Sequence, residues 1–173
     1  MPEHIVPYEN FNQAVIGLGN KRVPRCYFNV VKLKKHETYK YHLQEFESVC
    51  VGASGSFHVD VEGNRFDHVG ERTQIFGGKP DSVYVPLDSE AVLTGASDEA
   101  VIFIAGGRYE EKGEPFRVTP NDIDKVQYGS DDTKTHRKIY HILGQKTKDR
   151  TGRLFVSELF TVGAGGWSGF PPH

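Results

Sequence analysis

The chain has 173 residues, of which 37% are hydrophobic and 25% are charged, a composition typical of a soluble globular protein. Its formal net charge is −2 and its sequence pI is about 6.4, which argues against binding to nucleic acid or to an acidic membrane surface. No stretch approaches the roughly 18 consecutive apolar residues of a membrane span, and the first residues lack the pattern of a secretory signal. We therefore expect a cytoplasmic protein with neither nucleic acid nor a membrane as its partner.

Short strands with alternating apolar and polar residues dominate the first part of the chain. A hairpin is predicted where Phe57–Val61 and Arg65–Val69 flank the turn residues Gly63 and Asn64. Further strands are predicted at residues 25–33, 48–53, 73–76, 82–85, 91–94 and 100–104. Gly, Pro, Asp or Ser lies in most of the gaps. Evenly spaced short strands without helical periodicity predict an all-β fold, an antiparallel jelly roll.

The pattern changes after Arg108. Residues 109–135 are polar and rich in Asp, Lys, Gly and Pro, which predicts a connector with one short strand at 123–128. Two more strands are predicted at 137–143 and 154–162. Because two strands cannot bury a face by themselves, they either pad the first jelly roll or begin a second one. We expect a jelly roll at 1–108, a connector at 109–135, and the first strands of an incomplete second jelly roll at 136–173.

The segment from His36 to Glu47 is a candidate metal site, because it contains two imidazoles and three carboxylates. A jelly-roll metal site needs two histidines one residue apart, so that both side chains point into the barrel. His36 and His42 are six residues apart, with a predicted turn between them. We favour rim polar residues here and a degenerate or absent metal site in the first jelly roll; a metal site remains the minor alternative.

The cysteines and the other histidines are interpreted mainly as structural or surface residues. Cys26 and Cys50 lie in apolar segments without a metal-binding spacing, which predicts buried, reduced thiols. His58 and His68 are predicted to be exposed on the polar face of the hairpin. His141 alternates with apolar residues and is a candidate for a residue that faces a cleft, although a lone histidine is more often structural.

The last residues form an unusual sequence, Gly165-Gly166-Trp167-Ser168-Gly169-Phe170-Pro171-Pro172-His173. Stiff apolar residues followed by an imidazole look like the first half of a metal-binding turn. Spacing alone favours a Gly- and Pro-rich tail. A single histidine cannot hold a metal by itself, because a tight site needs about three or four converging ligands.

The run from Phe160 to His173 resembles the signature of the 5-deoxy-glucuronate isomerases of myo-inositol catabolism. In that family a Gly-Asn-Trp-Ser-Ser-Tyr-Pro-Pro-His stretch continues into Lys-His-Asp. This chain departs from the pattern at Gly166, where the family has Asn, and at Gly169-Phe170, where it has Ser-Tyr. Other segments match in the same order: Glu37-Thr38-Tyr39, Glu47, Ser54-Gly55, Val61-Glu62-Gly63, Val83-Tyr84-Val85-Pro86 and residues 137–143.

The resemblance implies a bicupin, with two cupin jelly rolls in one chain and a divalent metal, zinc or manganese, in the second. His173 matches the first metal ligand of the family pattern. The implied activity is metal-dependent aldose–ketose isomerisation of a sugar-acid substrate, 5-deoxy-D-glucuronate, to 2-deoxy-5-keto-D-gluconate. The resemblance names neither the general base nor the residues that bind the substrate carboxylate. We expect this chain to be an N-terminal portion that retains no metal and is inactive alone.

Two alternatives remain open from the sequence. The first is a non-catalytic cupin that binds sugars or mediates oligomerisation. The second is a relative of the 5-keto-4-deoxyuronate isomerases, which use the same architecture and reaction type. The last two predicted strands would also expose their edges, which predicts association into homo-oligomers.

Overall fold

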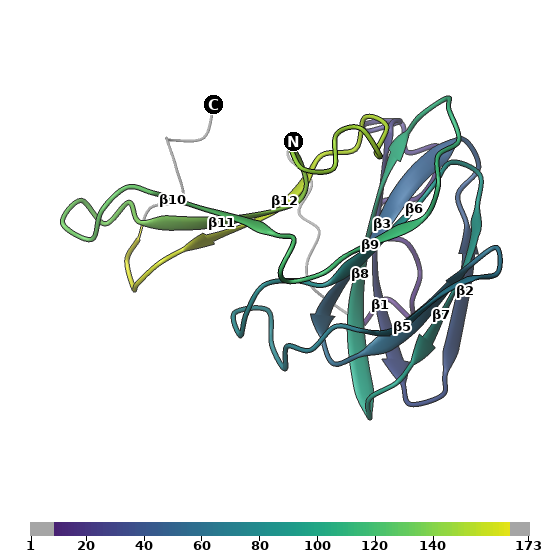
Figure 1. The fold of residues 1–173 in the computed structure, drawn as a ribbon, viewed down its shortest axis with the longest axis horizontal. Coiled ribbons are helices and arrows are strands. Elements are labelled where there is room, and N and C mark those ends of the chain that lie inside the picture. The colour runs from purple at the N-terminus through teal and green to yellow at the C-terminus, as the bar shows by residue number, and fades with distance from the viewer. Residues whose placement is uncertain (1–8, 167–173) are drawn as a thin grey trace.

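The computed structural model describes residues 9–166, and within them it contains strands, turns and loops but no helix. This part of the chain therefore has no helix that is long and apolar enough to cross a membrane. Figure 1 shows a two-layered sandwich, from which a smaller sheet extends to one side.

The first nine strands belong to the sandwich and the last three to the smaller sheet. They are β1 (Cys26–Lys34), β2 (Thr38–His42), β3 (Phe46–Ser54), β4 (Phe57–Val61), β5 (Asn64–Val69), β6 (Ser82–Val85), β7 (Glu90–Gly95), β8 (Glu99–Arg108), β9 (Phe116–Val118), β10 (Asp124–Tyr128), β11 (Arg137–Leu143) and β12 (Val156–Thr161). We call residues 26–118 the sandwich and residues 124–161 the arm.

The order of the strands confirms the predicted jelly roll. One sheet has the order β1-β8-β3-β6-β9 and the other the order β2-β7-β4-β5, with all neighbours antiparallel. An eight-stranded jelly roll is wound so that the first strand pairs with the eighth and the second with the seventh. Strands β1 to β8 follow this order, and β9 extends the first sheet beyond β6.

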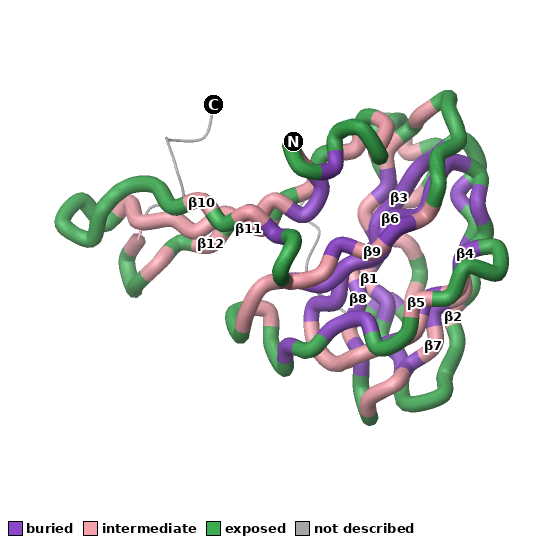
Figure 2. The backbone as a smooth tube through the Cα atoms, viewed as in Figure 1, coloured by how far each residue is buried: buried purple, intermediate pink, exposed green. Residues whose placement is uncertain are grey.

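The two sheets bury their facing sides because apolar residues alternate along each strand. In β8, Ala100, Ile102 and Ile104 are fully buried between the sheets, and in β4 the same holds for Phe57 and Val59. Figure 2 shows this concentration of buried backbone inside the sandwich, whereas the loops at the far end of the arm are exposed. Hydrophobic burial is therefore the main force that holds the sandwich together.

The arm is a three-stranded antiparallel sheet of order β10-β11-β12. Its near end packs on the sandwich through Ile142 and Leu143, which lie on Tyr84 and Phe116 over the outer face of the five-stranded sheet. Further along β12, Phe160 contacts Phe76 of the sandwich, with ring centroids 5.6 Å apart. The arm therefore packs most closely on the sandwich at its near end, and most of its other described residues are half-buried or exposed.

Three details of the local structure test the strand predictions. The hairpin is confirmed, but its turn lies one residue earlier than predicted: Glu62 and Gly63 join β4 to β5, both with positive φ (49° and 89°), as a tight primed turn requires, and Asn64 is the first residue of β5. The strand predicted at 73–76 is wrong, because these residues form bends and turns, in which the Ile75 carbonyl accepts a hydrogen bond from the Arg72 guanidinium. The stretch predicted as a connector contains β9, which pairs with β6 and was not predicted.

Candidate functional site

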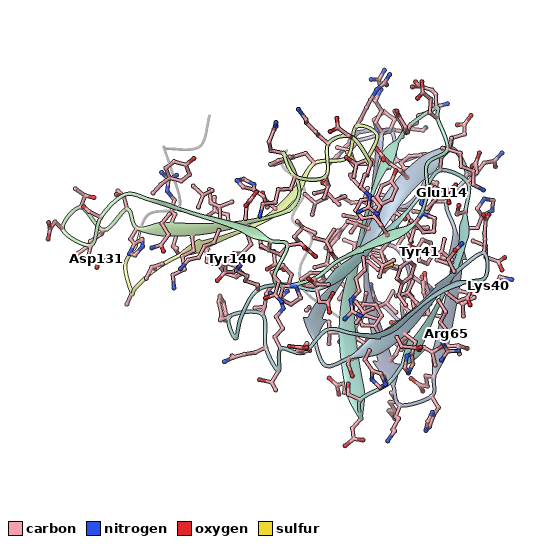
Figure 3. The ribbon with its side chains drawn as sticks, viewed as in Figure 1. Lys40, Tyr41, Arg65, Glu114, Asp131 and Tyr140 are labelled. Atoms are coloured by element: carbon pink, nitrogen blue, oxygen red, sulfur yellow. The ribbon has the colours of Figure 1, made fainter. Side chains whose placement is uncertain are left out.

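The interior of the sandwich holds a polar cluster at the place where β2 and β3 face each other. The Tyr41 hydroxyl lies 3.1 Å from both Ser48 Oγ and Cys50 Sγ, and all three residues are buried. Figure 3 shows Tyr41 within the sandwich. Burial raises the pKa of the Cys50 thiol to about 12, and burial, together with Cys50, raises the pKa of Tyr41. These are protonated hydroxyl and thiol groups, which do not suit a divalent metal.

The candidate metal segment does not form a metal site. The turn predicted between His36 and His42 is wrong, because Thr38–His42 form β2 and the turn lies at residues 35–36, before the strand. Both histidines are exposed, while Glu47 points to the outer face of the five-stranded sheet. Among residues 9–166, no group of three or more His, Cys, Asp or Glu side chains could hold a metal ion. The described residues of the sandwich therefore offer no cluster for a divalent metal, and the metal that the resemblance implies belongs to the second jelly roll.

The thiols differ from each other. Both cysteines are free, but only Cys50 is buried, whereas Cys26 is exposed. The prediction for Cys26 is wrong because this residue is the first of β1, where the chain enters the sheet and its side chain is not covered.

Glu47 is a buried carboxylate that joins the sandwich to the arm. It lies in β3 with no exposed surface, and it accepts a hydrogen bond of 2.6 Å from the Tyr84 hydroxyl. It also accepts three backbone N–H groups, from Gly152 (2.8 Å), Arg153 (2.6 Å) and Leu154 (2.7 Å). A buried charge is tolerated only where such donors replace water. Glu47 therefore fixes the loop between β11 and β12 on the sandwich.

A second buried contact joins Arg72 of the sandwich to Glu158 of β12. Two guanidinium nitrogens lie 2.8 and 2.5 Å from the two carboxylate oxygens of Glu158, and the side chains are 3% and 11% exposed. The Nε atom of Arg72 donates to the Gly52 carbonyl of β3 at 2.9 Å. This planar, bidentate ion pair fixes the orientation of β12 as well as its distance from the sandwich.

Beside the loop that Glu47 holds lies a hollow of about 360 Å³, formed by that loop, the start of β10 and the end of β11. Its lining includes Asp124, His141, Lys148, Thr151 and Phe155. Asp124 and His141 are paired neighbours on β10 and β11, and the His141 ring lies 5.5 Å from that of Phe155. The prediction that His141 faces a cleft agrees with its position in this lining.

The remaining histidines occupy other places. His58 Nδ1 lies 2.7 Å from Asp67 and its side chain is 21% exposed, so it is more covered than predicted, whereas His68 is exposed as predicted. His136 contacts Asp131 at 2.9 Å. His173, the predicted metal ligand, lies outside the described residues, as do Trp167 and the residues that follow it.

Sequence reasoning missed the roles of Glu47 and Arg72. A signal was present for Glu47, since it stands in Phe46–Ser54, a strand whose other residues are apolar or small. A carboxylate in a strand buried on both faces needs fixed donors nearby. The partner of Arg72 carries no such signal, because Glu158 is 86 residues further along the chain.

Comparison with known proteins agrees with the resemblance seen in the sequence. Residues 7–173 match the model of the KduI/IolB family. The chain is 27% identical over 147 residues to a 5-deoxy-glucuronate isomerase of Bacillus subtilis (strain 168), covering 84% of this chain and 52% of that protein. It is 30% identical over 160 residues to a 5-deoxy-glucuronate isomerase of Lacticaseibacillus casei, covering 91% of this chain and 57% of that protein. The chain thus spans about half the length of the curated relatives that it matches.

Solved structures agree on the fold. An IolB-like protein from Salmonella typhimurium LT2 superposes with a TM-score of 0.64 at 22% sequence identity, over 69% of this chain and 44% of that chain. The protein YlbA of E. coli superposes with a TM-score of 0.51 at 13% identity, over 82% of this chain and 60% of that chain. The match of the family model over nearly all of the sequence establishes that the chain belongs to the KduI/IolB family.

Proposed function

We propose that this chain is part of a 5-deoxy-glucuronate isomerase, which converts 5-deoxy-D-glucuronate to 2-deoxy-5-keto-D-gluconate in inositol catabolism. The observation that carries the proposal is its 27–30% identity to proteins of that name over 84–91% of the chain. The reaction moves a proton between neighbouring carbons of a sugar acid, which requires a general base and a group that polarises the carbonyl. Bound at that centre, a divalent metal would supply the polarisation.

In this proposal the described residues hold the structure in place and take no part in the reaction. The jelly roll is a rigid scaffold with a filled interior, and Glu47 and Arg72 hold the arm against it. The proposal includes a metal, zinc or manganese, because His173 matches a metal ligand of the family pattern, and it is the one residue of this chain that does so. Since residues 9–166 bring no three potential ligands together, we expect the 173-residue chain to retain little metal and to turn over little substrate.

The test is an assay of the natural gene product, read from its start codon to its stop codon, for formation of the keto product. Turnover that falls on chelation and returns with zinc or manganese supports the proposal. A folded gene product that leaves 5-deoxy-D-glucuronate unchanged contradicts it. The same assay with 5-keto-4-deoxyuronate as the substrate decides between the two isomerase activities.

The 173-residue chain, assayed in parallel, tests the narrower expectation. Metal analysis after dialysis should find well below one metal ion per chain, and product formation should not exceed that of the buffer. Stoichiometric metal together with turnover would show that this chain is an active enzyme by itself.

A sugar-binding module without catalysis is the second candidate. The observation that favours it is the interior of the sandwich, where the Tyr41 hydroxyl contacts Ser48 and Cys50 and no set of metal ligands is found among the described residues. If the natural gene product binds a sugar acid reversibly but forms no product with any added metal, this second function replaces the first.

A further inference from the structure

The hollow beside His141 has the size and rigidity of a binding site. Its volume of about 360 Å³ falls in the range of about 300–1,000 Å³ that small-molecule sites occupy. The loop that forms one wall is held by hydrogen bonds from Gly152, Arg153 and Leu154 to Glu47. Thr147 closes the other end of this loop through Gly144. The wall is therefore fixed before any ligand arrives, so binding does not have to order it.

His141 carries an unexplained polar atom in this wall. Its Nδ1 atom is buried and has no hydrogen-bond partner among the described residues. A buried nitrogen without a partner weakens the folded state, and an apolar residue of similar shape would avoid that loss. A buried N–H in that place would find no acceptor, so the ring proton belongs on Nε2. The lining of the hollow thus offers the Nε2–H group of His141 as an unused donor.

The neighbours of His141 complete a set of contacts for one type of ligand. Phe155 is 61% exposed although it is a large apolar ring, and it offers a flat surface beside His141. Lys148 lines the hollow without a hydrogen-bond or ion-pair partner in the described chain. Asp124 contacts Lys146 at 2.7 Å through one carboxylate oxygen, which leaves the other as an acceptor. Lys148 can bind a carboxylate, and His141 and Asp124 can form hydrogen bonds with hydroxyl groups. The Phe155 ring can pack against a C–H face, so the set matches a carboxylic acid that carries several hydroxyl groups.

We propose that this hollow binds a sugar acid, with the carboxylate on Lys148, hydroxyl groups on His141 Nε2 and Asp124, and the carbon skeleton against Phe155. The site consists only of described residues and needs no metal. It is therefore independent of the isomerase proposal, and the sugar acid bound there is not required to react.

The test is a titration of the 15N-labelled 173-residue chain with D-glucuronate in metal-free buffer, followed by two-dimensional NMR. We expect saturable shifts of the amides of residues 144–155 and of the His141 ring nitrogens, and spectra of the free protein that show the Nε2–H tautomer. Lys148→Gln should weaken binding about tenfold, the equivalent of one charge-assisted hydrogen bond. His141→Phe should abolish saturable binding, while its midpoint of urea unfolding stays equal to or above that of the wild type.

The matched control is Lys125→Gln, which removes a lysine next to Asp124 but on the opposite face of β10, across from Tyr140. It should bind D-glucuronate as tightly as the wild type. Shifts that do not saturate, or an equal loss of affinity in Lys125→Gln, would overturn the proposal. D-glucose and acetate separate the two parts of the ligand, and binding of either as tightly as D-glucuronate would refute the assignment to a sugar acid. Because the readout is binding without turnover, an inactive enzyme does not affect the result.

Discussion

The sandwich and the arm are stabilised by different kinds of interaction. Between the two sheets of the sandwich, apolar side chains such as Ile102 and Leu93 are completely buried. In the arm, β12 alternates between half-buried and exposed residues and has no fully buried side chain. The contacts that hold it include the buried carboxylate of Glu47 and the largely buried carboxylate of Glu158, which is 11% exposed. The comparison teaches that the jelly roll depends on hydrophobic burial, whereas the position of the arm depends on a few directional polar contacts.

Breaking the ion pair between Arg72 and Glu158 should give the largest effect. Arg72→Met leaves the Glu158 carboxylate, which is 11% exposed, without its cation, and removal of one partner of a buried pair costs about 3–5 kcal/mol. Amide hydrogen exchange should show this loss in β12 and a much smaller change in β8. Arg65→Met is the control, because its pair with Asp67 is on the surface and should have no measurable effect. Equal loss of protection in β8 and β12 would mean that the two regions form one cooperative unit.

A pair of leucines compares the two regions directly. Leu93→Ala in the core of the sandwich should lower the free energy of unfolding by about 2–5 kcal/mol, because it leaves a cavity. Leu159→Ala in β12, where the side chain is 47% exposed, should lower it by less than about 1 kcal/mol. Urea unfolding of both variants measures the difference. Similar losses would indicate that another surface covers Leu159.

Removal of the charge on Glu47 should detach the loop more than it weakens the sandwich. Glu47→Gln replaces one carboxylate oxygen by an NH2 group that cannot accept, so either the N–H group of Gly152 or those of Arg153 and Leu154 lose their acceptor, at a cost of about 2–3 kcal/mol. Hydrogen exchange at residues 144–155 should rise accordingly. Glu45→Gln, on an exposed residue two positions away, should leave exchange in this loop unchanged. A loss confined to β3 would show that Glu47 supports its own strand and not the loop.

Alkaline pH should weaken the sandwich through its buried thiol. Burial raises the pKa of Cys50 from 9.0 to about 12, so between these values only the unfolded chain releases the proton. The contribution of the protonated Cys50 thiol to the free energy of unfolding is complete below pH 9, and it is lost as the pH rises towards 12. Urea unfolding at mildly and strongly alkaline pH should show a shallower loss for Cys50→Ala than for the wild type. Cys26→Ala, at an exposed cysteine, should keep the wild-type slope.

Association of chains should be the weakest effect. β10 and β12 are the outer strands of the arm, and their unpaired backbone groups can add a strand from another molecule. Light scattering at rising protein concentration should show an increasing mean mass. A mass that stays at 19.4 kDa at the highest concentration would contradict association through these edges.

Much of the sandwich was predictable from the sequence, because its strands alternate apolar and polar residues and its turns contain glycine. The predicted strand at 82–85 has the same bounds in the structure, and in the arm the strand predicted at 137–143 does as well. β9 was missed because three residues are too short to show a period, and β2 was missed because its residues Thr38–His42 are mostly polar or half-exposed. The strand predicted at 73–76 failed because Arg72 binds the carbonyl groups of Ile75 and Gly78 and bends the chain.

The candidate site was less predictable, for a physical reason. The sequence identified His141 as a residue that faces a cleft, but the cleft itself depends on contacts between distant segments. Glu47 contacts residues 105–107 positions away, and no periodicity within a strand reveals such a partner. The metal ligand predicted at His173 lies outside the described residues and stays a prediction.

The winding of the jelly roll has a consequence for the order in which the chain acquires its structure. β1 forms its ladder with β8, from Cys26 paired with Gly107 to Lys34 paired with Glu99. During synthesis the first strand therefore waits, with its apolar residues uncovered, until the eighth has emerged. Sequence-distant pairing of this kind slows folding and exposes intermediates to aggregation. We expect refolding of the sandwich to be limited by closure of the β1–β8 ladder, with β4 and β5, joined by their tight turn, forming early.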